Sequence, residues 1–199
     1  MRQERAVLTR GRLLRAAAGE FALHGYAGTS LQEVCGSAGV SMGALTFHFS
    51  TKRALAEAIA ESGAAEVRDT VERVTTDEAG PLLTVARLTC DIAGLLAVSP
   101  VVRAAARLEK ELGSAAGGWC AVWRPPVEEL LDQARALKEL TAGVEAESVV
   151  QLAERLLFGA AVVVDSEAGA GTDARAESER LARIWSAVMH GVRAPAQPD

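Results

Sequence analysis

Two tryptophans are the residues of this sequence best suited to binding a small molecule. Trp119 and Trp123 are four residues apart, so a helix would place both indole rings on one face. Such a pair can line an apolar slot and donate two N–H groups to a carbonyl group, although two core tryptophans are the simpler alternative. The apolar residues that we expect to line the same cavity are Leu88, Ile92, Phe158 and Val162.

The sequence offers little material for catalysis or metal binding. The three histidines are far apart and form no HxxxH or HExxH pair, and neither a Walker loop nor a GxGxxG motif before a strand occurs. We therefore predict that the chain is not an enzyme and holds no cofactor or metal. Three cysteines without CxxC spacing indicate buried apolar residues in a reducing cytoplasm, with a redox sensor or a metal site as the alternative: Cys35, Cys90 and Cys120.

Charge is distributed unevenly along the chain. The first 53 residues carry seven Lys or Arg and three Asp or Glu, whereas the whole chain has a net charge of −5. The N-terminal segment is therefore positive and the rest of the chain is negative. A basic segment on an otherwise acidic protein indicates that this segment alone faces a polyanion such as DNA.

The N-terminal segment has the pattern of a helix-turn-helix. A first helix is predicted over residues 7–24, where apolar residues recur at helical spacing and a glycine follows as a stop. Ser30 and Glu33 form a capping box at the start of a second helix, which we expect to end before Gly39. Ser41 then caps a short third helix, and a helix held out after a tight turn in this way can enter a major groove.

The remaining sequence is also helical in its periodicity, and strong helix formers dominate the composition. We therefore predict an all-α protein with an N-terminal three-helix HTH DNA-binding domain at residues 1–53. A helical effector-binding and dimerisation domain follows at residues 54–193, and a disordered tail at 194–199. The further helices are expected over residues 52–74, 81–97, 100–112, 119–140, 147–164 and 174–192.

The last two predicted helices are more apolar than one small domain needs. The run LLFGAAVVV is apolar all round, and the final helix carries a stripe of apolar residues at helical spacing. A two-fold partner would cover the second face of each helix and give a four-helix dimer interface, whereas a purely internal core is the alternative. The candidate interface residues are Leu156, Val163, Leu181, Ile184, Trp185 and Val188.

Residues 25–55, GYAGTSLQEVCGSAGVSMGALTFHFSTKRAL, resemble the DNA-binding signature of TetR-family repressors. More narrowly, RQERAVLTRGRLLRAAAGEFALHGY, GALTFHF and SPVVRAAARL are similar to γ-butyrolactone autoregulator receptors of actinomycetes, as are the regions around Trp123 and Trp185. The resemblance covers most of the chain. It implies an α-helical homodimer that binds a partly palindromic operator in double-stranded DNA and leaves it when a small hydrophobic effector binds.

The resemblance also indicates the class of effector and of regulated gene. A γ-butyrolactone, a butenolide or an antibiotic intermediate would bind in the C-terminal core, where Trp123 matches a ligand-facing tryptophan of related receptors. The regulated genes would be those of antibiotic or other secondary metabolism. A multidrug-type repressor of an efflux gene and a ligand-free dimeric DNA-binding regulator are the alternatives.

The DNA-contacting residues are expected at the N-termini of the second and third helices and among the flanking basic residues. Two of them depart from the family pattern, since many members carry tyrosine at the position of Thr46 and related receptors often carry lysine at that of Met42. Both changes remove long polar side chains and either weaken or redirect DNA binding. The candidates are Thr9, Arg10, Thr29, Ser30, Ser41, Met42, Gly43, Ala44, Thr46, His48 and Lys52.

Overall fold

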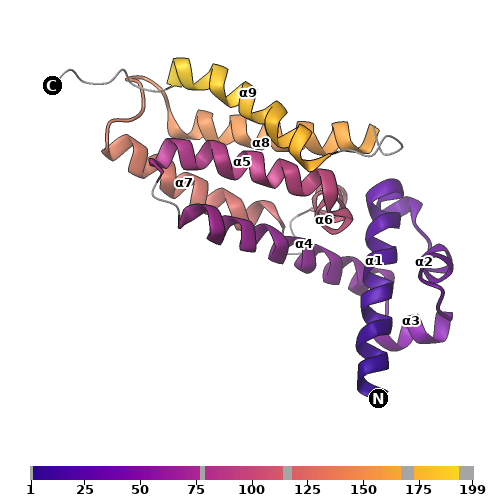
Figure 1. Cartoon of the computed structure of the whole chain (residues 1–199). Helices are drawn as coiled ribbons and strands as arrows, with labels where there is room; N and C mark the ends of the chain where they lie inside the picture. The colour runs from indigo at the N-terminus through magenta and orange to yellow at the C-terminus, as the bar shows by residue number, and fades with distance from the viewer. Residues whose placement is uncertain (1, 77–78, 114–117, 167–172, 193–199) are drawn as a thin grey trace. The chain divides into compact units, whose positions relative to one another are not determined.

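The computed structural model describes residues 2–76, 79–113, 118–166 and 173–192, which form helices and their connections (Figure 1). No strand occurs in these ranges, so the all-α prediction is confirmed. The predicted disordered tail lies outside the described residues. The helices are α1 (Arg2–Gly28), α2 (Leu31–Ala38), α3 (Met42–His48), α4 (Lys52–Thr75), α5 (Pro81–Val98), α6 (Pro100–Leu112), α7 (Cys120–Ala136), α8 (Ala146–Ser166) and α9 (Ala174–Val192).

The chain divides into two compact units. The first comprises Met1–Glu66 and Ser99–Cys120, and the second comprises Val67–Val98 and Ala121–Asp199. Helix α6 thus belongs to the same unit as the helix-turn-helix, which the order of the residues alone does not indicate. The domain boundary expected after residue 53 separates a DNA-binding from an effector-binding domain. The two compact units describe packing and not these functions, so this boundary stays a prediction.

A small apolar core holds the helix-turn-helix together. Phe21 of α1, Val34 of α2 and Leu45 of α3 are fully buried in it, and Val40 in the turn packs against its edge. Helices of eight and seven residues, such as α2 and α3, are not stable alone, so their positions depend on this core.

The ends of the two short helices follow the predicted capping residues. Ser30 Oγ accepts a hydrogen bond from Glu33 N–H (3.2 Å), and Glu33 Oε2 accepts one from Ser30 N–H (2.7 Å), which completes the capping box. Gly39 ends α2 in a left-handed conformation with φ of 62°. Ser41 accepts a hydrogen bond from Ala44 N–H at the start of α3. The turn between the helices is therefore fixed by residues that are close in sequence.

Helix α1 is longer than predicted and is interrupted. It begins at Arg2 and continues to Gly28, but Gly25 has φ of 71° and ψ of −178°, which no helical residue adopts. The glycine that the sequence marks as a stop therefore breaks the helix, and one further turn follows the break.

Helix α7 is shorter than predicted. It runs through Pro125 and Pro126 and ends at Ala136 rather than at residue 140. Lys138 lies just beyond the end in the left-handed region, with φ of 58°. Leu137 N–H donates to Gln133 O (2.9 Å) and Glu139 N–H donates to Ala134 O (2.8 Å), and these bonds close the last turn.

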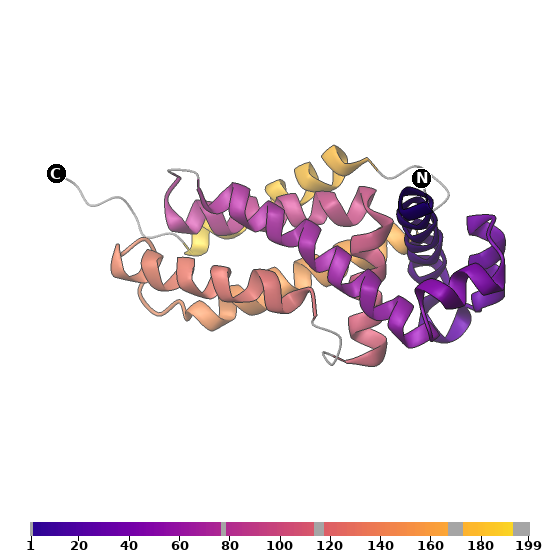
Figure 2. The ribbon, with the colours of Figure 1, turned by 90° about the horizontal axis from the view of Figure 1, so that it is seen from below.

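Helix α5 is the central helix of the second unit. Helices α8 and α9 pack against it, as the two ribbon views show (Figures 1 and 2). By length and composition α5 is apolar enough to cross a membrane, but 67% of it is buried inside the folded chain. It is therefore a core helix, and its fully or almost fully buried side chains include Leu82, Val85, Leu88, Ile92 and Leu96.

Helices α4 and α6 approach each other closely at Gly63. A Cβ atom at this position would lie 2.5 Å from Ala105 Cβ and 3.0 Å from Val101 O. We expect Gly63→Ala to lower the free energy of unfolding by about 1–3 kcal/mol, because overpacking outweighs the gain in helix propensity. Urea unfolding followed by circular dichroism measures this change.

Gly19→Ala is the matched control for Gly63→Ala. Gly19 is also helical, but nothing lies within 4 Å of a Cβ atom built there. This substitution should raise the free energy of unfolding by up to about 1 kcal/mol through helix propensity alone. Similar effects of the two substitutions would contradict the close approach of α4 and α6.

Candidate functional site

Helix α3 is anchored on one side and open on the other. Leu45 is fully buried, and Phe49, which follows the helix, is almost fully buried. These two side chains hold α3 against the core and leave its opposite side accessible to a ligand. Of the predicted base-reading residues, Ala44 and His48 are partly buried, and the exposed ones are Ser41, Met42, Gly43 and Thr46.

The hydroxyl group of Thr46 is used within its own helix. Thr46 Oγ1 lies 3.1 Å from Met42 O and 3.2 Å from Gly43 O and donates to these carbonyl oxygens. Its proton is therefore not available to a phosphate oxygen while this bond persists. The short side chain of Thr46 is thus turned toward α3 itself.

Phe47 was not among the predicted site residues, but it is the most exposed large apolar side chain on α3. It is 81% exposed, and its ring meets that of His48 edge-on at a centroid distance of 5.2 Å. An apolar ring on a face that enters a groove can contact a thymine methyl group or a sugar. The signal for this role in the sequence is its position two residues from both Leu45 and Phe49, on the opposite side of the helix.

Residues 39–43, GVSMG, match the G-x-S-x-G spacing of a hydrolase nucleophile elbow. That motif places its serine on a sharp turn from a strand into a helix. Ser41 instead lies between two helices, and its Oγ accepts a hydrogen bond from Ala44 N–H at 3.2 Å. The serine is therefore a helix cap rather than a nucleophile.

The N-terminus of α2 is already occupied by side chains of the protein. Thr29 is almost fully buried and donates its hydroxyl proton to Gly25 O (2.9 Å), so this side chain joins α2 to the end of α1. Hydrogen bonds with Ser30, first its side chain and then its backbone, hold the pKa of Glu33 below its usual value. A phosphate at this terminus would have to share it with the Glu33 carboxylate, so the phosphate contacts of Thr29 and Ser30 stay predictions.

Two predicted DNA-contacting cations rest on aromatic rings. The guanidinium group of Arg10 lies 5.4 Å from the centroid of the Phe49 ring, and Lys52 Nζ lies 4.5 Å from that of Tyr26. Such cation–π contacts fix the direction of a long side chain without neutralising its charge. Thr9, the predicted DNA-contacting residue before Arg10, is partly buried and donates its hydroxyl proton to Arg5 O (2.8 Å).

The predicted effector residues fall into two groups. Trp119 and Trp123 are both fully buried, but Trp119 belongs to the first unit and Trp123 to the second. Leu88 and Ile92, also fully buried, lie with Trp123 in the second unit, as the prediction of a shared apolar site requires. Phe158 and Val162 are 37% and 60% exposed on α8, a placement that does not favour a role in lining a buried cavity.

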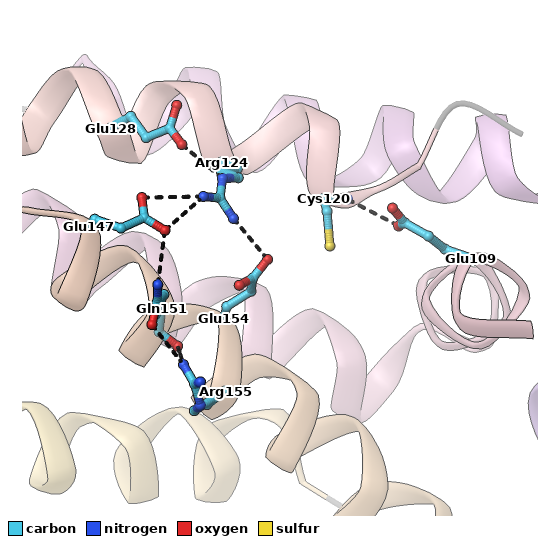
Figure 3. Close-up of polar contacts among 8 residues, drawn as sticks. All are labelled: Glu109, Cys120, Arg124, Glu128, Glu147, Gln151, Glu154 and Arg155. Carbon is cyan, nitrogen blue, oxygen red and sulfur yellow. Dashed lines mark hydrogen bonds and ion pairs between the residues drawn. The ribbon is translucent and has the colours of Figure 1, made fainter. Parts of the chain in front are cut away.

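Arg124, the residue after Trp123, connects α7 to α8 (Figure 3). Its guanidinium group forms ion pairs with Glu128 (2.8 Å), Glu147 (3.2 Å) and Glu154 (3.1 Å). The hydrogen bond to Glu128, together with the charges of the three carboxylates, raises the pKa of Arg124 above its usual value. The spacing of Arg124 and Glu128 indicates one of these pairs in the sequence, whereas the two pairs to α8 depend on the fold.

The predicted dimer residues divide between the core and the surface of the single chain. Leu181 and Trp185 are buried within the chain, Ile184 is 38% exposed, and Leu156 and Val188 are partly buried. The side chain of Val163 lies outside the described residues. Part of the apolar stripe of α9 is therefore internal core, and its role at an interface stays a prediction.

The buried thiol of Cys90 is unsuited to redox chemistry. Burial, aided by the charge of Asp91, raises the pKa of Cys90 to about 11. The thiolate is the reactive form, so this cysteine is inert at neutral pH. Cys35 is also buried, while Cys120 is partly exposed.

Comparisons with known proteins agree with this arrangement. Residues 13–59 match the family of bacterial regulatory proteins, tetR family. The HTH-type transcriptional regulator CymR of Pseudomonas putida is 51% identical over 49 residues, which are 25% of this chain and 24% of CymR, so the match spans about a quarter of that relative.

Solved structures match nearly the whole chain. A γ-butyrolactone receptor (ArpA-like protein) is 30% identical, with a TM-score of 0.78, and the match covers 95% of this chain and 90% of that one. The TetR-family protein CprB from Streptomyces coelicolor, in complex with its biological operator sequence, is 29% identical, with a TM-score of 0.73 and coverage of 96% and 91%.

The capping box at α2 provides a test of the helix-turn-helix. We expect Ser30→Ala to lower the free energy of unfolding by about 1 kcal/mol at pH 7, because Glu33 N–H loses its side-chain acceptor. Urea unfolding measures the change. An unchanged midpoint would contradict the role of Ser30 as a cap.

The pH dependence of Glu33→Gln is an independent check of the same box. The pKa of Glu33 is lower in the folded chain than the usual value of 4.5, so its contribution is present above pH 4.5 and is lost as the pH falls through the folded pKa. Glu33→Gln should therefore be less stable than the wild type at pH 7 and equally stable in strong acid. A constant difference at all pH values would contradict this assignment.

Proposed function

The chain belongs to the tetR family of bacterial regulatory proteins, and from this premise we propose that it is a ligand-responsive repressor of the γ-butyrolactone receptor type. The observation that carries the proposal is the match of nearly the whole chain to such a receptor at 30% identity. Members of the family are DNA-binding transcription factors rather than enzymes, which confirms the prediction that the chain has no catalytic role.

The proposed operator contacts lie on α3 and on the basic residues beside it. The exposed side of α3 offers Met42, Gly43 and Phe47 to the bases, and its mostly apolar chemistry suits thymine methyl groups. Arg10 and Lys52 supply phosphate contacts. The positive charge of the first 53 residues supports this direction of approach, since the rest of the chain is acidic.

The proposed effector is a small hydrophobic molecule that accepts a hydrogen bond. Trp123 is buried beside the apolar core of the second unit, and its indole N–H is a donor suited to a carbonyl oxygen. A γ-butyrolactone, a butenolide or an antibiotic intermediate has this chemistry. We infer that the regulated genes serve antibiotic or other secondary metabolism.

Release from DNA requires a dimer whose two α3 helices no longer match their half-sites. In a dimer these sites are about 34 Å apart, so a small displacement prevents simultaneous binding. The exposed apolar residues Phe158, Val162 and Ile184 on α8 and α9 support a two-fold interface there. Reducing the DNA-competent population from 99% to 1% needs about 5.5 kcal/mol of differential effector binding.

We infer that the dimer acts in the cytoplasm.

The proposal is tested by a gel shift with DNA from upstream of the protein's own gene, with and without a culture extract. Retardation that the extract abolishes supports a ligand-responsive repressor. Retardation that no extract alters favours a ligand-free regulator, and release by unrelated drugs alone favours a multidrug sensor of an efflux gene. No retardation at low salt would overturn the proposed operator.

Trp123→Phe tests the effector site. The variant keeps an aromatic ring but lacks the N–H donor, so the amount of extract needed for release should rise about tenfold while DNA binding stays unchanged. Trp185→Phe is the matched control, because Trp185 is also buried but lies on α9, outside the predicted effector site. Equal responses of the two variants would argue against Trp123 as the donor.

Met42→Lys tests the DNA site. A lysine on the exposed side of α3 adds one phosphate contact, so DNA affinity should rise and the slope of log K against log salt should steepen by about one unit. Leu137→Lys adds the same charge at an exposed position of the second unit and should leave the slope unchanged. Fluorescence anisotropy over a salt series measures both slopes, and equal slopes would place Met42 away from the DNA.

A further inference from the structure

Two charged side chains of α6 lie against the break in α1. Arg107 Nη1 donates hydrogen bonds to Ala22 O (2.9 Å) and Leu23 O (3.0 Å), and Arg107 Nε forms an ion pair with Glu111 Oε1 (3.0 Å). Glu111 Oε2 accepts a hydrogen bond from Tyr26 N–H (2.6 Å). All these residues belong to the first unit.

The pair replaces a hydrogen bond that an unbroken helix would make. In a continuous α-helix Tyr26 N–H would donate to Ala22 O. Here Arg107 donates to Ala22 O and Glu111 accepts from Tyr26 N–H, so both backbone groups have charged partners on α6. The Glu111 carboxylate lies against Gly25, in the space that a Cβ atom at this position would occupy. The glycine at the break therefore leaves room for the Glu111 carboxylate beside the Tyr26 N–H group.

The backbone held in this way leads directly to the predicted DNA site. Thr29 Oγ1 donates to Gly25 O, and Ser30 caps α2 immediately afterwards. The ring of Tyr26 stacks on that of Phe21 at a centroid distance of 6.0 Å. The same Tyr26 ring makes a cation–π contact with Lys52, whose Nζ lies 4.5 Å from the ring centroid. The turn that Glu111 holds thus sets both the start of α2 and the direction of the Lys52 side chain.

We propose that Arg107 and Glu111 of α6 are positioning residues of the DNA site, acting through the turn at Gly25 and Tyr26. The inference rests on the proposed DNA binding, but neither residue touches the DNA itself. Both side chains are partly exposed, and an exposed ion pair contributes little to global stability. Loss of the pair should therefore affect the order of this turn and the affinity for DNA more than it affects the unfolding temperature.

The test measures DNA affinity, local order and stability of the full-length protein. The DNA is the upstream fragment used above, and affinity is measured by fluorescence anisotropy. Glu111→Leu should weaken binding about tenfold and speed amide exchange over residues 26–31, with little change in Tm. Glu111→Gln keeps an oxygen acceptor for Tyr26 N–H and should recover most of both properties.

A matched control and a second variant complete the design. Glu179→Leu removes the equivalent pair of Arg175 and Glu179 (2.8 Å), which lies within α9 of the second unit, and should behave as the wild type. Arg107→Lys keeps the charge but not the fork that reaches Ala22 O, Leu23 O and Glu111, so it should weaken DNA binding even if Glu111→Leu fails to fold.

The outcomes separate this inference from the proposed function. If the wild type binds the DNA and both α6 variants bind it equally well, the positioning role is overturned. The positioning role is also overturned if the α6 variants lose DNA affinity in proportion to their loss of Tm and Glu111→Gln restores neither property. If the wild type itself binds no DNA, the proposed function fails, and amide exchange at Tyr26 alone then decides whether the pair holds the turn.

Discussion

The need to satisfy backbone polar groups where α1 breaks governs the arrangement of the first unit. A helix-turn-helix requires its first helix to end so that the second can start in a new direction, and each such end leaves N–H and C=O groups without helical partners. Here the partners come from α6, a helix that follows the DNA-binding segment by more than forty residues of sequence. The DNA-binding segment is therefore completed by α6, which is consistent with its membership of the first unit.

Much of the fold was predictable because its signals are local. Capping residues and left-handed glycines act over three or four residues, and so the bounds of α2 and α6 and the start of α3 were expected almost to the residue. The end of α7 was not, because the chain leaves the helix at Lys138, a residue type that does not mark the left-handed conformation. The sequence also did not predict the turn of α1 beyond Gly25. The N–H group of Tyr26 in this turn donates to Glu111, which is 85 residues away in sequence, so no local signal marks the turn.

The sequence predicts a site residue well when its role follows from its position along a helix. It does not predict whether an apolar face of a helix is buried by the rest of the chain or exposed to solvent. The pattern identified α3 and its first residues, but an apolar residue such as Phe47 is ordinarily assigned to a core. The same ambiguity affected α8 and α9, where Phe158 is exposed and Trp185 is internal. Periodicity shows that a helix has an apolar face, but only the folded chain shows what covers it.

The close approach of α4 and α6 has a consequence for how this sequence can vary. At Gly63 the space that a side chain would fill is already taken by the methyl group of Ala105. The crossing therefore constrains the combined volume of positions 63 and 105 rather than either residue alone. Homologous chains that keep this crossing should show compensating changes at these two positions, with a small residue at one accompanying growth at the other.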